Sequence, residues 1–303
     1  MTRIDTYADT DSKNGSGGIL CSSHLRIRLG LGSRWYELHD QFLQPFPLIP
    51  HPTSLSDSCL FLIMTVRATC REFVERHCGE FDASHDISHI DRVVANAIKV
   101  FKLSDETTRQ SVDIEVLIII ASLHDSFDHK YLTTPEAVSA AKTRVVQFLN
   151  QDVGLLPETT EMIIAVIDNM GYTTEVGSGP RAFDATTTLY LHIVQDADRL
   201  DAIGAVGLAR CFAYVGAFGQ AIISPTCQDE RLQRKELQAG SLQRVVRKGD
   251  SGIGICYDKL VFLKDMLKTA AGRAIGQQRH EYLLQFLDQF FEEACDLDDV
   301  CEL

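Results

Sequence analysis

The hydrophobic pattern along this chain is helical over most of its length. Between residues 86 and 102 the apolar positions recur at three and four residues, and Asp86 stands where a helix N-cap belongs. Similar patterns predict helices over residues 134–151, 158–170 and 189–214, and two more helices close the chain. Residues 216–252 hold Gly, Pro and mixed charges and predict a loop with at most one short helix. The pattern therefore predicts an all-α fold.

Residues 114–123 are apolar nearly all round. Because Ile and Val favour β-sheet, this segment taken alone is also compatible with a buried strand. The flanking helical patterns, and the lack of any partner strand in the sequence, favour a central buried helix.

The first 63 residues differ from the rest of the chain. They show no period of 3.6 or 2, and they hold four of the eight prolines, at positions 45, 47, 50 and 52. Prolines at that density block both helices and sheets. We expect a poorly ordered N-terminal extension over residues 1–63, dispensable for fold and catalysis, and one domain over residues 64–303. A start of the protein at Met64, or a targeting or partner-binding arm before it, are the alternative interpretations.

Composition narrows the range of partners. The chain carries 42 acidic and 29 basic residues, a formal charge of −13. Such a surface repels polyanions, so we expect no stable nucleic-acid partner and no membrane association. A small phosphorylated substrate is compatible, because a bound divalent cation dominates the local field. Nine cysteines without a C-x-x-C pair indicate reduced thiols and a cytoplasmic protein. A homodimer stays open.

Three short segments concentrate the residue types that bind metals. They read HDISHIDRV (85–93), LHDSFDHK (123–130) and QDADRLD (195–201), and each lies on or at the end of a predicted helix. Buried charge is costly unless it is paired or holds a metal. His124 and Asp125 can both turn toward one ion, and a histidine and a carboxylate from the other segments would complete the set. Such ligands suit Mn, Fe, Ni, Co or Mg better than structural zinc.

This order of residues resembles the H…HD…D signature of the HD superfamily of metal-dependent phosphohydrolases. Segments 85–93, 121–131, 194–216 and 257–293 are similar, in the right order, to its YedJ/YpgQ-like branch. The resemblance implies an all-α HD-domain helical bundle with a central metal site. It also implies hydrolysis of a phosphoanhydride or phosphoester, with a nucleoside triphosphate as one substrate class.

The resemblance further assigns roles to single residues. It places one divalent ion on His89, His124, Asp125 and Asp198. Manganese is the expected metal, with Mg²⁺, Fe²⁺, Co²⁺ and Ni²⁺ as alternatives. Asp196 is the other candidate for the last ligand. If Asp198 is that ligand, Asp128 or Asp196 would be the general base. The expected substrate-binding residues are Arg92, Lys130, Arg199, His85 and Asp201.

Two other functions compete with this interpretation. A di-iron oxygenase of HD type needs additional histidines before the last aspartate, and none occurs between His129 and His192. A catalytically silent HD domain would bind nucleotides or proteins without turnover, but such domains usually lose a ligand. The complete ligand set therefore favours a phosphohydrolase with one metal ion.

Overall fold

The structure, a computed structural model, describes residues 57–77, 86–127, 132–178, 182–225, 227–244 and 251–294. By its internal contacts the chain divides into two units, Met1–Leu55 and Ser56–Leu303, and every described residue belongs to the second. The regular elements in the described ranges are helices, and β-structure there is limited to an isolated bridge between Ala221 and Ser251. The predicted all-α class is confirmed.

The helices follow one another with short connections. The first are α1 (Asp57–His77), α2 (Ile87–Leu103), α3 (Glu106–Ser111), α4 (Ile114–Leu123), α5 (Pro135–Gln147), the π-helical turn η1 (Phe148–Asp152) and α6 (Pro157–Asp168). They continue with α7 (Tyr172–Ser178), α8 (Ala185–Asp201), α9 (Gly204–Ala217), α10 (Gln228–Gln238), α11 (Gly252–Asp258), the 3₁₀ helix η2 (Leu260–Met266) and α12 (Ala270–Ala294). The single short helix expected within residues 216–252 corresponds to α10.

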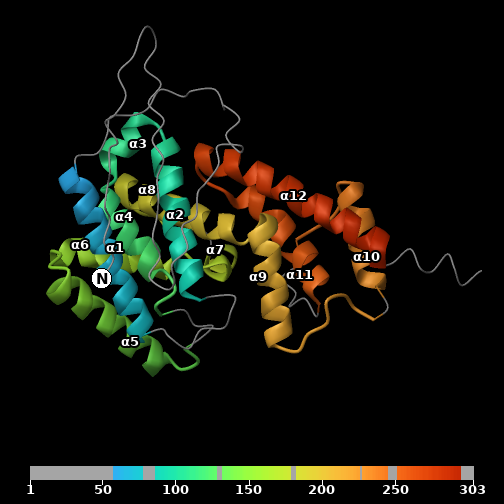
Figure 1. The fold of residues 1–303 in the computed structure, drawn as a ribbon, viewed down its shortest axis with the longest axis horizontal. Helices are drawn as coiled ribbons and strands as arrows, with labels where there is room; N and C mark the ends of the chain where they lie inside the picture. The colour runs from blue at the N-terminus through green and yellow to red at the C-terminus, as the bar shows by residue number, and fades with distance from the viewer. Residues whose placement is uncertain are drawn as a thin grey trace, which may run out of the picture. The chain divides into compact units, whose positions relative to one another are not determined.

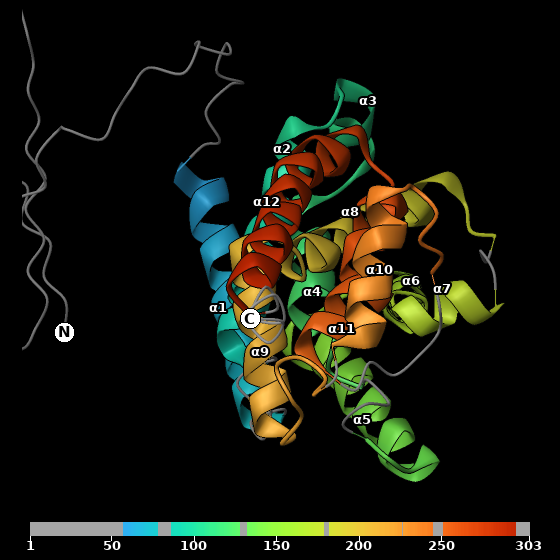
Figure 2. The ribbon, with the colours of Figure 1, turned by 90° about the vertical axis from the view of Figure 1, so that its right-hand side faces the viewer.

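Helix α4 forms the centre of the core. Every residue from Val116 to Leu123 is buried, and the helix packs against α1, α2, α6 and α8 (Figures 1 and 2). A helix that is apolar all round must be surrounded, because each fully exposed Leu or Ile would forfeit about 1.5–3 kcal/mol of burial free energy. The central buried helix predicted over residues 114–123 is confirmed. Its end carries His124 into the protein interior.

Helix α2 packs along α8, and its start is defined by a cap. The side chain of Asp86 accepts a hydrogen bond from the backbone N–H of His89 at 3.0 Å, which confirms the predicted N-cap. Residues three and four apart lie on one face of a helix, so His89 shares the buried face with Val93. The cap therefore determines where along α2 the buried histidine lies.

The C-terminal helices form a second group around α12. This helix packs against α2, α8, α9 and η2, and Figure 1 shows it extending over α9 and α11. Leu283, Leu287 and Phe291 line its buried face. This confirms that a helix closes the chain, as the sequence predicts. Because α12 contacts both α8 and α9, it bridges the region where those two helices meet.

The single helix predicted over residues 189–214 is wrong. The chain forms α8 and α9, which are bent by 70° at a short break. Gly204 opens α9 with a φ of +77°, a left-handed conformation that other residues rarely adopt. Buried Ile203 and Leu208 continue the apolar pattern across the break, so the periodicity does not reveal it. Regular structure also begins earlier than expected, at Asp57 instead of Met64.

None of the described helices is by itself long and apolar enough to cross a membrane. The bent pair of α8 and α9 meets the criterion of length and composition when the two are joined. Buried residues are spread along α8 from Thr187 to Asp201.

The bend at Gly204 provides a test of the fold. A Cβ at this position would lie 3.1 Å from the Cβ of Arg279, in a backbone conformation with positive φ. We predict that Gly204→Ala lowers the free energy of unfolding by about 1–2 kcal/mol. Gly216→Ala is the matched control, because it lies in α9 with no neighbour within 4 Å of its Cβ. That variant should be unchanged or more stable by up to about 1 kcal/mol. Urea unfolding followed by circular dichroism measures both, and equal effects would contradict the prediction.

The start of α1 provides a second test. We propose that residues 1–55 are dispensable for the helical fold. A protein that starts at Ser56 keeps α1 whole, whereas one that starts at Met64 loses residues 57–63 of this helix. The melting temperature of the first should lie within about 2 °C of the full chain, and that of the second should be lower. A drop of more than about 5 °C for the Ser56 start would contradict this proposal.

Candidate metal centre

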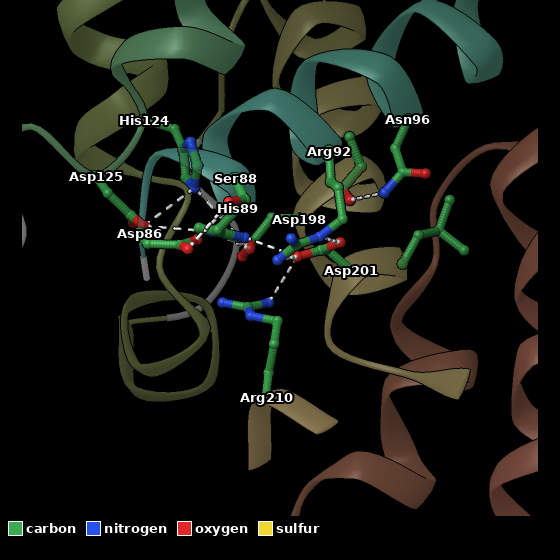
Figure 3. A network of polar contacts seen from close by, with 12 residues as sticks. Asp86, Ser88, His89, Arg92, Asn96, His124, Asp125, Asp198, Asp201 and Arg210 are labelled. Carbon is green, nitrogen blue, oxygen red and sulfur yellow. Dashed lines mark hydrogen bonds and ion pairs between the residues drawn. The ribbon is translucent and has the colours of Figure 1, made fainter. Parts of the chain in front are cut away.

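Four side chains converge where α2, α4 and α8 meet. His89 comes from α2, His124 and Asp125 from the end of α4, and Asp198 from α8 (Figure 3). The Nε2 atom of His89 lies 3.4 Å from Oδ2 of Asp125 and 3.6 Å from Oδ1 of Asp198. The Nε2 atom of His124 lies 3.3 Å and 3.9 Å from the same two oxygens. The structure thus brings together the four residues that the sequence suggests as metal ligands.

Each histidine ring is oriented through its other nitrogen. The Nδ1 atom of His124 lies 2.9 Å from the carbonyl oxygen of Ala121, which can only accept, so Nδ1 carries a proton. The Nε2 atom of His124 is buried and has no hydrogen-bond partner among the described residues. The Nδ1 atom of His89 lies 2.8 Å from Oδ2 of Asp201. Both Nε2 atoms are therefore directed to one buried point between two carboxylates, as a divalent cation requires.

The electrostatics of this point favours a cation. Burial alone would lower the pKa of His124, but Asp125 and Asp198 raise it to about 9. Burial likewise opposes the ionisation of Asp125, yet the two imidazoles hold its pKa well below the usual value. A proton on His124 thus supplies positive charge to the two carboxylates, and a divalent ion can displace it. Ligand atoms of His89, His124 and Asp125 lie within 4.8 Å of one another, so these residues fit a metal ion.

Asp201, a predicted substrate-binding residue, is engaged by side chains of the protein. Its carboxylate is almost fully buried and contacts Nδ1 of His89. It also accepts a hydrogen bond of 2.8 Å from Nε of Arg92, and it lies 3.0 Å from Nη1 of Arg210. Burial opposes its charge, but these donors lower the pKa of Asp201 to about 2. Asp201 therefore orients His89, and Arg92 is bound to Asp201 (Figure 3).

Asp196 lies in a different environment from the one expected for a catalytic base. Its carboxylate has no exposed surface and accepts from the backbone N–H groups of Lys268 at 2.7 Å and Thr269 at 2.8 Å. Residues two apart on a helix point about 200° apart, so Asp196 faces α12 when Asp198 faces the metal centre. A Cβ on Gly272 would lie 2.2 Å from Oδ2 of Asp196, so the close approach of α12 requires glycine there. Asp196 therefore holds the start of α12.

Arg199 is also engaged elsewhere than expected. Its side chain is buried, donates to the carbonyl oxygen of Met266 at 2.6 Å and forms an ion pair with Glu175 of α7. Glu175 also pairs with Lys268. The positive charge of Arg199 is thus offset within the fold, which argues against the phosphate-binding role suggested by the sequence.

Three of the expected site residues, His85, Asp128 and Lys130, lie outside the described residues, and their roles stay predictions. Sequence reasoning missed Arg210 and Glu175. Arg210 follows the bend between α8 and α9, and Glu175 lies in a short helix that carries no motif. Neither residue has a local signal, because its partner lies on another helix.

Comparison with known proteins finds relatives that share this fold. No family model matches the chain. The crystal structure of an HD-superfamily hydrolase from Bacillus thuringiensis is similar, with 27% identity, a TM-score of 0.52, and coverage of 76% of this chain and 97% of that one. The chain has a fold consistent with an HD-domain protein, as its sequence motifs predict, and this similar structure is that of a hydrolase.

Individual relatives narrow the class further. YpgQ of Bacillus subtilis (strain 168), an uncharacterized protein, is 27% identical over 231 residues, which cover 75% of this chain and 93% of YpgQ. The crystal structure of YpgQ in complex with ADP has the same fold, with a TM-score of 0.53, 24% identity, and coverage of 77% and 98% of the two chains. Protein L803 of Acanthamoeba polyphaga mimivirus is 26% identical over 206 residues, 64% of this chain and 80% of that protein. The chain is a homologue of YpgQ.

Asp196 and Asp198 of α8 should respond to substitution in opposite ways. We predict that Asp198→Ala lowers the affinity for Mn²⁺ by at least about tenfold, because a direct ligand is lost. Asp196→Ala should keep that affinity but lower the free energy of unfolding by about 3 kcal/mol, because three donors at the start of α12 lose their acceptor. Calorimetric Mn²⁺ titration and urea unfolding measure the two effects. Loss of Mn²⁺ affinity in Asp196→Ala, with full affinity in Asp198→Ala, would reverse the assignment.

Proposed function

We propose that this protein is a metal-dependent phosphohydrolase that cleaves a phosphoanhydride bond in a nucleotide, in the manner of a nucleoside triphosphate pyrophosphohydrolase. The observation that carries the proposal is the convergence of two imidazole Nε2 atoms and two carboxylates on one buried point. One divalent ion would be held by His89, His124, Asp125 and Asp198. Mn²⁺ is the preferred ion, and Mg²⁺, Fe²⁺, Co²⁺ and Ni²⁺ are the alternatives. Asp125 and Asp198 bring negative charge, and the histidines bring neutral nitrogen ligands once His124 loses its proton.

The chain's own residues prepare this site for hydrolysis. When bound, the ion would polarise a phosphoryl oxygen and lower the pKa of a bound water. Asp201 keeps the proton on Nδ1 of His89 and so leaves Nε2 as a ligand. The Asp198 side chain is 41% exposed while His124 is almost fully buried, so the cation would be held from inside and approached from the side of Asp198. His85 and Lys130 as substrate contacts, and Asp128 as general base, remain part of the proposal.

A nucleotide is the substrate class that the relatives support best. The homologue YpgQ has been crystallised in complex with ADP, which carries a phosphoanhydride. The net charge of −13 repels free polyphosphates, whereas a divalent ion in the site reverses the local field for a small phosphate group. The proposal therefore predicts that turnover depends strictly on the added metal.

A substrate screen tests this function directly. Metal-depleted protein would be assayed with Mn²⁺ against nucleoside triphosphates, ADP and simple phosphomonoesters, with phosphate and pyrophosphate release as the readout. We expect release from at least one nucleotide, and reduction to background in His124→Ala and Asp125→Ala. The exposed histidine of α1 provides the matched control, because His77→Ala should retain activity.

Each competing function has its own result in this screen. Oxygen consumption by iron-loaded protein, without phosphate release, would support the di-iron oxygenase. Nucleotide binding without turnover, with any of the metals, would support the silent domain. Either result would overturn the phosphohydrolase.

A further inference from the structure

Asp201 also lines a cavity apart from the four candidate metal ligands. It has a volume of about 400 Å³ and lies between α2, the start of α9 and α12. Its described lining includes Arg92, Asn96, Ile203, Val206, Arg279 and Tyr282. None of the four candidate metal ligands lines it, and Asp201 is the acidic residue in its described lining. The cavity is therefore distinct from the metal centre but shares a wall with it.

This wall carries more positive than negative charge. Arg92 lines the cavity and contacts the carboxylate of Asp201, the acidic side chain of the described lining. Arg279 adds a second guanidinium group to the lining. Its hydrogen bonds go to neutral acceptors, the carbonyl oxygen of Leu200 and, at 3.0 Å, the side-chain oxygen of Asn96, and its charge also interacts with Asp201. A surplus of guanidinium groups in a chain with a charge of −13 indicates a place for an anion.

The remaining lining suits the body of an organic molecule. Val206 is 42% exposed and Tyr282 is 50% exposed, although both are apolar or aromatic and line the cavity together with buried Ile203. Ligand cavities commonly combine such apolar walls with a few polar groups that orient the ligand. Guanidinium groups bind phosphate through paired N–H donors, and a tyrosine ring offers a face for a planar group.

We infer that this cavity is a second binding site for an organic phosphate, whose phosphate contacts Arg92 and Arg279 and whose planar body packs on Tyr282. A ligand bound in this cavity affects the metal centre through Arg92, Asp201 and His89. These residues form consecutive contacts of 2.8 Å. An anion that attracts Arg92 weakens its bond to Asp201. Asp201 then accepts more strongly from His89, which makes Nε2 a better metal ligand. Binding of a phosphate in this cavity does not depend on the proposed function. The effect of that binding on metal affinity does depend on the proposed metal site.

Binding is tested on the full chain without metal. In that state the carboxylates at the metal centre repel phosphates, so the heat of binding in calorimetry reports the second site. The probes are AMP, inorganic phosphate and adenosine. We expect AMP to bind more tightly than inorganic phosphate, and adenosine not to bind. Equal binding of phosphate and AMP would overturn the role of Tyr282, and absence of both would overturn the site.

Substitutions at the cavity locate the binding. Val206→Glu adds a negative charge at an exposed position, and it should weaken AMP binding by at least about tenfold. Leu232→Glu makes the same change at an exposed residue of α10 outside the cavity, and it should have no effect. Arg279→Gln is a second variant that should also lose AMP. Equal melting temperatures for Val206→Glu and the unmodified chain show that the fold is intact. Unchanged AMP affinity in both cavity variants would overturn the site.

Coupling is tested by the affinity for Mn²⁺ with and without saturating AMP. We expect AMP to tighten Mn²⁺ binding about fivefold or more, and Val206→Glu to abolish the difference. An affinity that does not change would overturn the link to His89. Phosphohydrolase activity in Val206→Glu should persist without AMP. A chain that binds AMP but releases no phosphate from any nucleotide would lose the proposed function while keeping this site.

Discussion

The burial of charge where α2, α4 and α8 meet is the constraint on which the rest of this structure depends. An unpaired ion in a protein interior costs several kcal/mol, so each charged group there must be compensated. His89 and His124 lie between Asp125 and Asp198, and Asp201 holds His89 from behind. Arg92 and Arg210 in turn compensate Asp201. The caps and packing of the three helices serve to keep these groups within a few ångströms of one another.

The bend after α8 allows Arg210, a residue outside the metal centre, to compensate the charge of Asp201. A straight continuation would carry α9 away, whereas a turn of 70° at Gly204 brings Arg210 back to Asp201. Helix α12 reinforces the same corner, since Arg279 donates to the backbone of Leu200 and to Asn96. The C-terminal helices thus support the metal centre without supplying any of its four candidate ligands.

The sequence predicts those features of the site that depend on local pattern. The apolar run before His124 indicates a buried helix, and Asp86 marks the start of α2; both agree with the structure. Asp196 shows the limit of such reasoning. It lies two residues from Asp198 and has the same chemistry, but its partners Lys268 and Thr269 lie some seventy residues away. The partners of Arg199 and Asp201 cannot be predicted from the sequence for the same reason, because only folding brings these distant residues together.

Helix α8 directs four residues to different partners within two turns. Asp196 faces α12, Asp198 the metal centre, Arg199 the short helix α7, and Asp201 both α2 and α9. Each residue along a helix turns the side chain by about 100°, so deleting a single residue here would redirect all of these groups at once. This stretch should therefore tolerate no change in length, and related chains should differ in length only outside it.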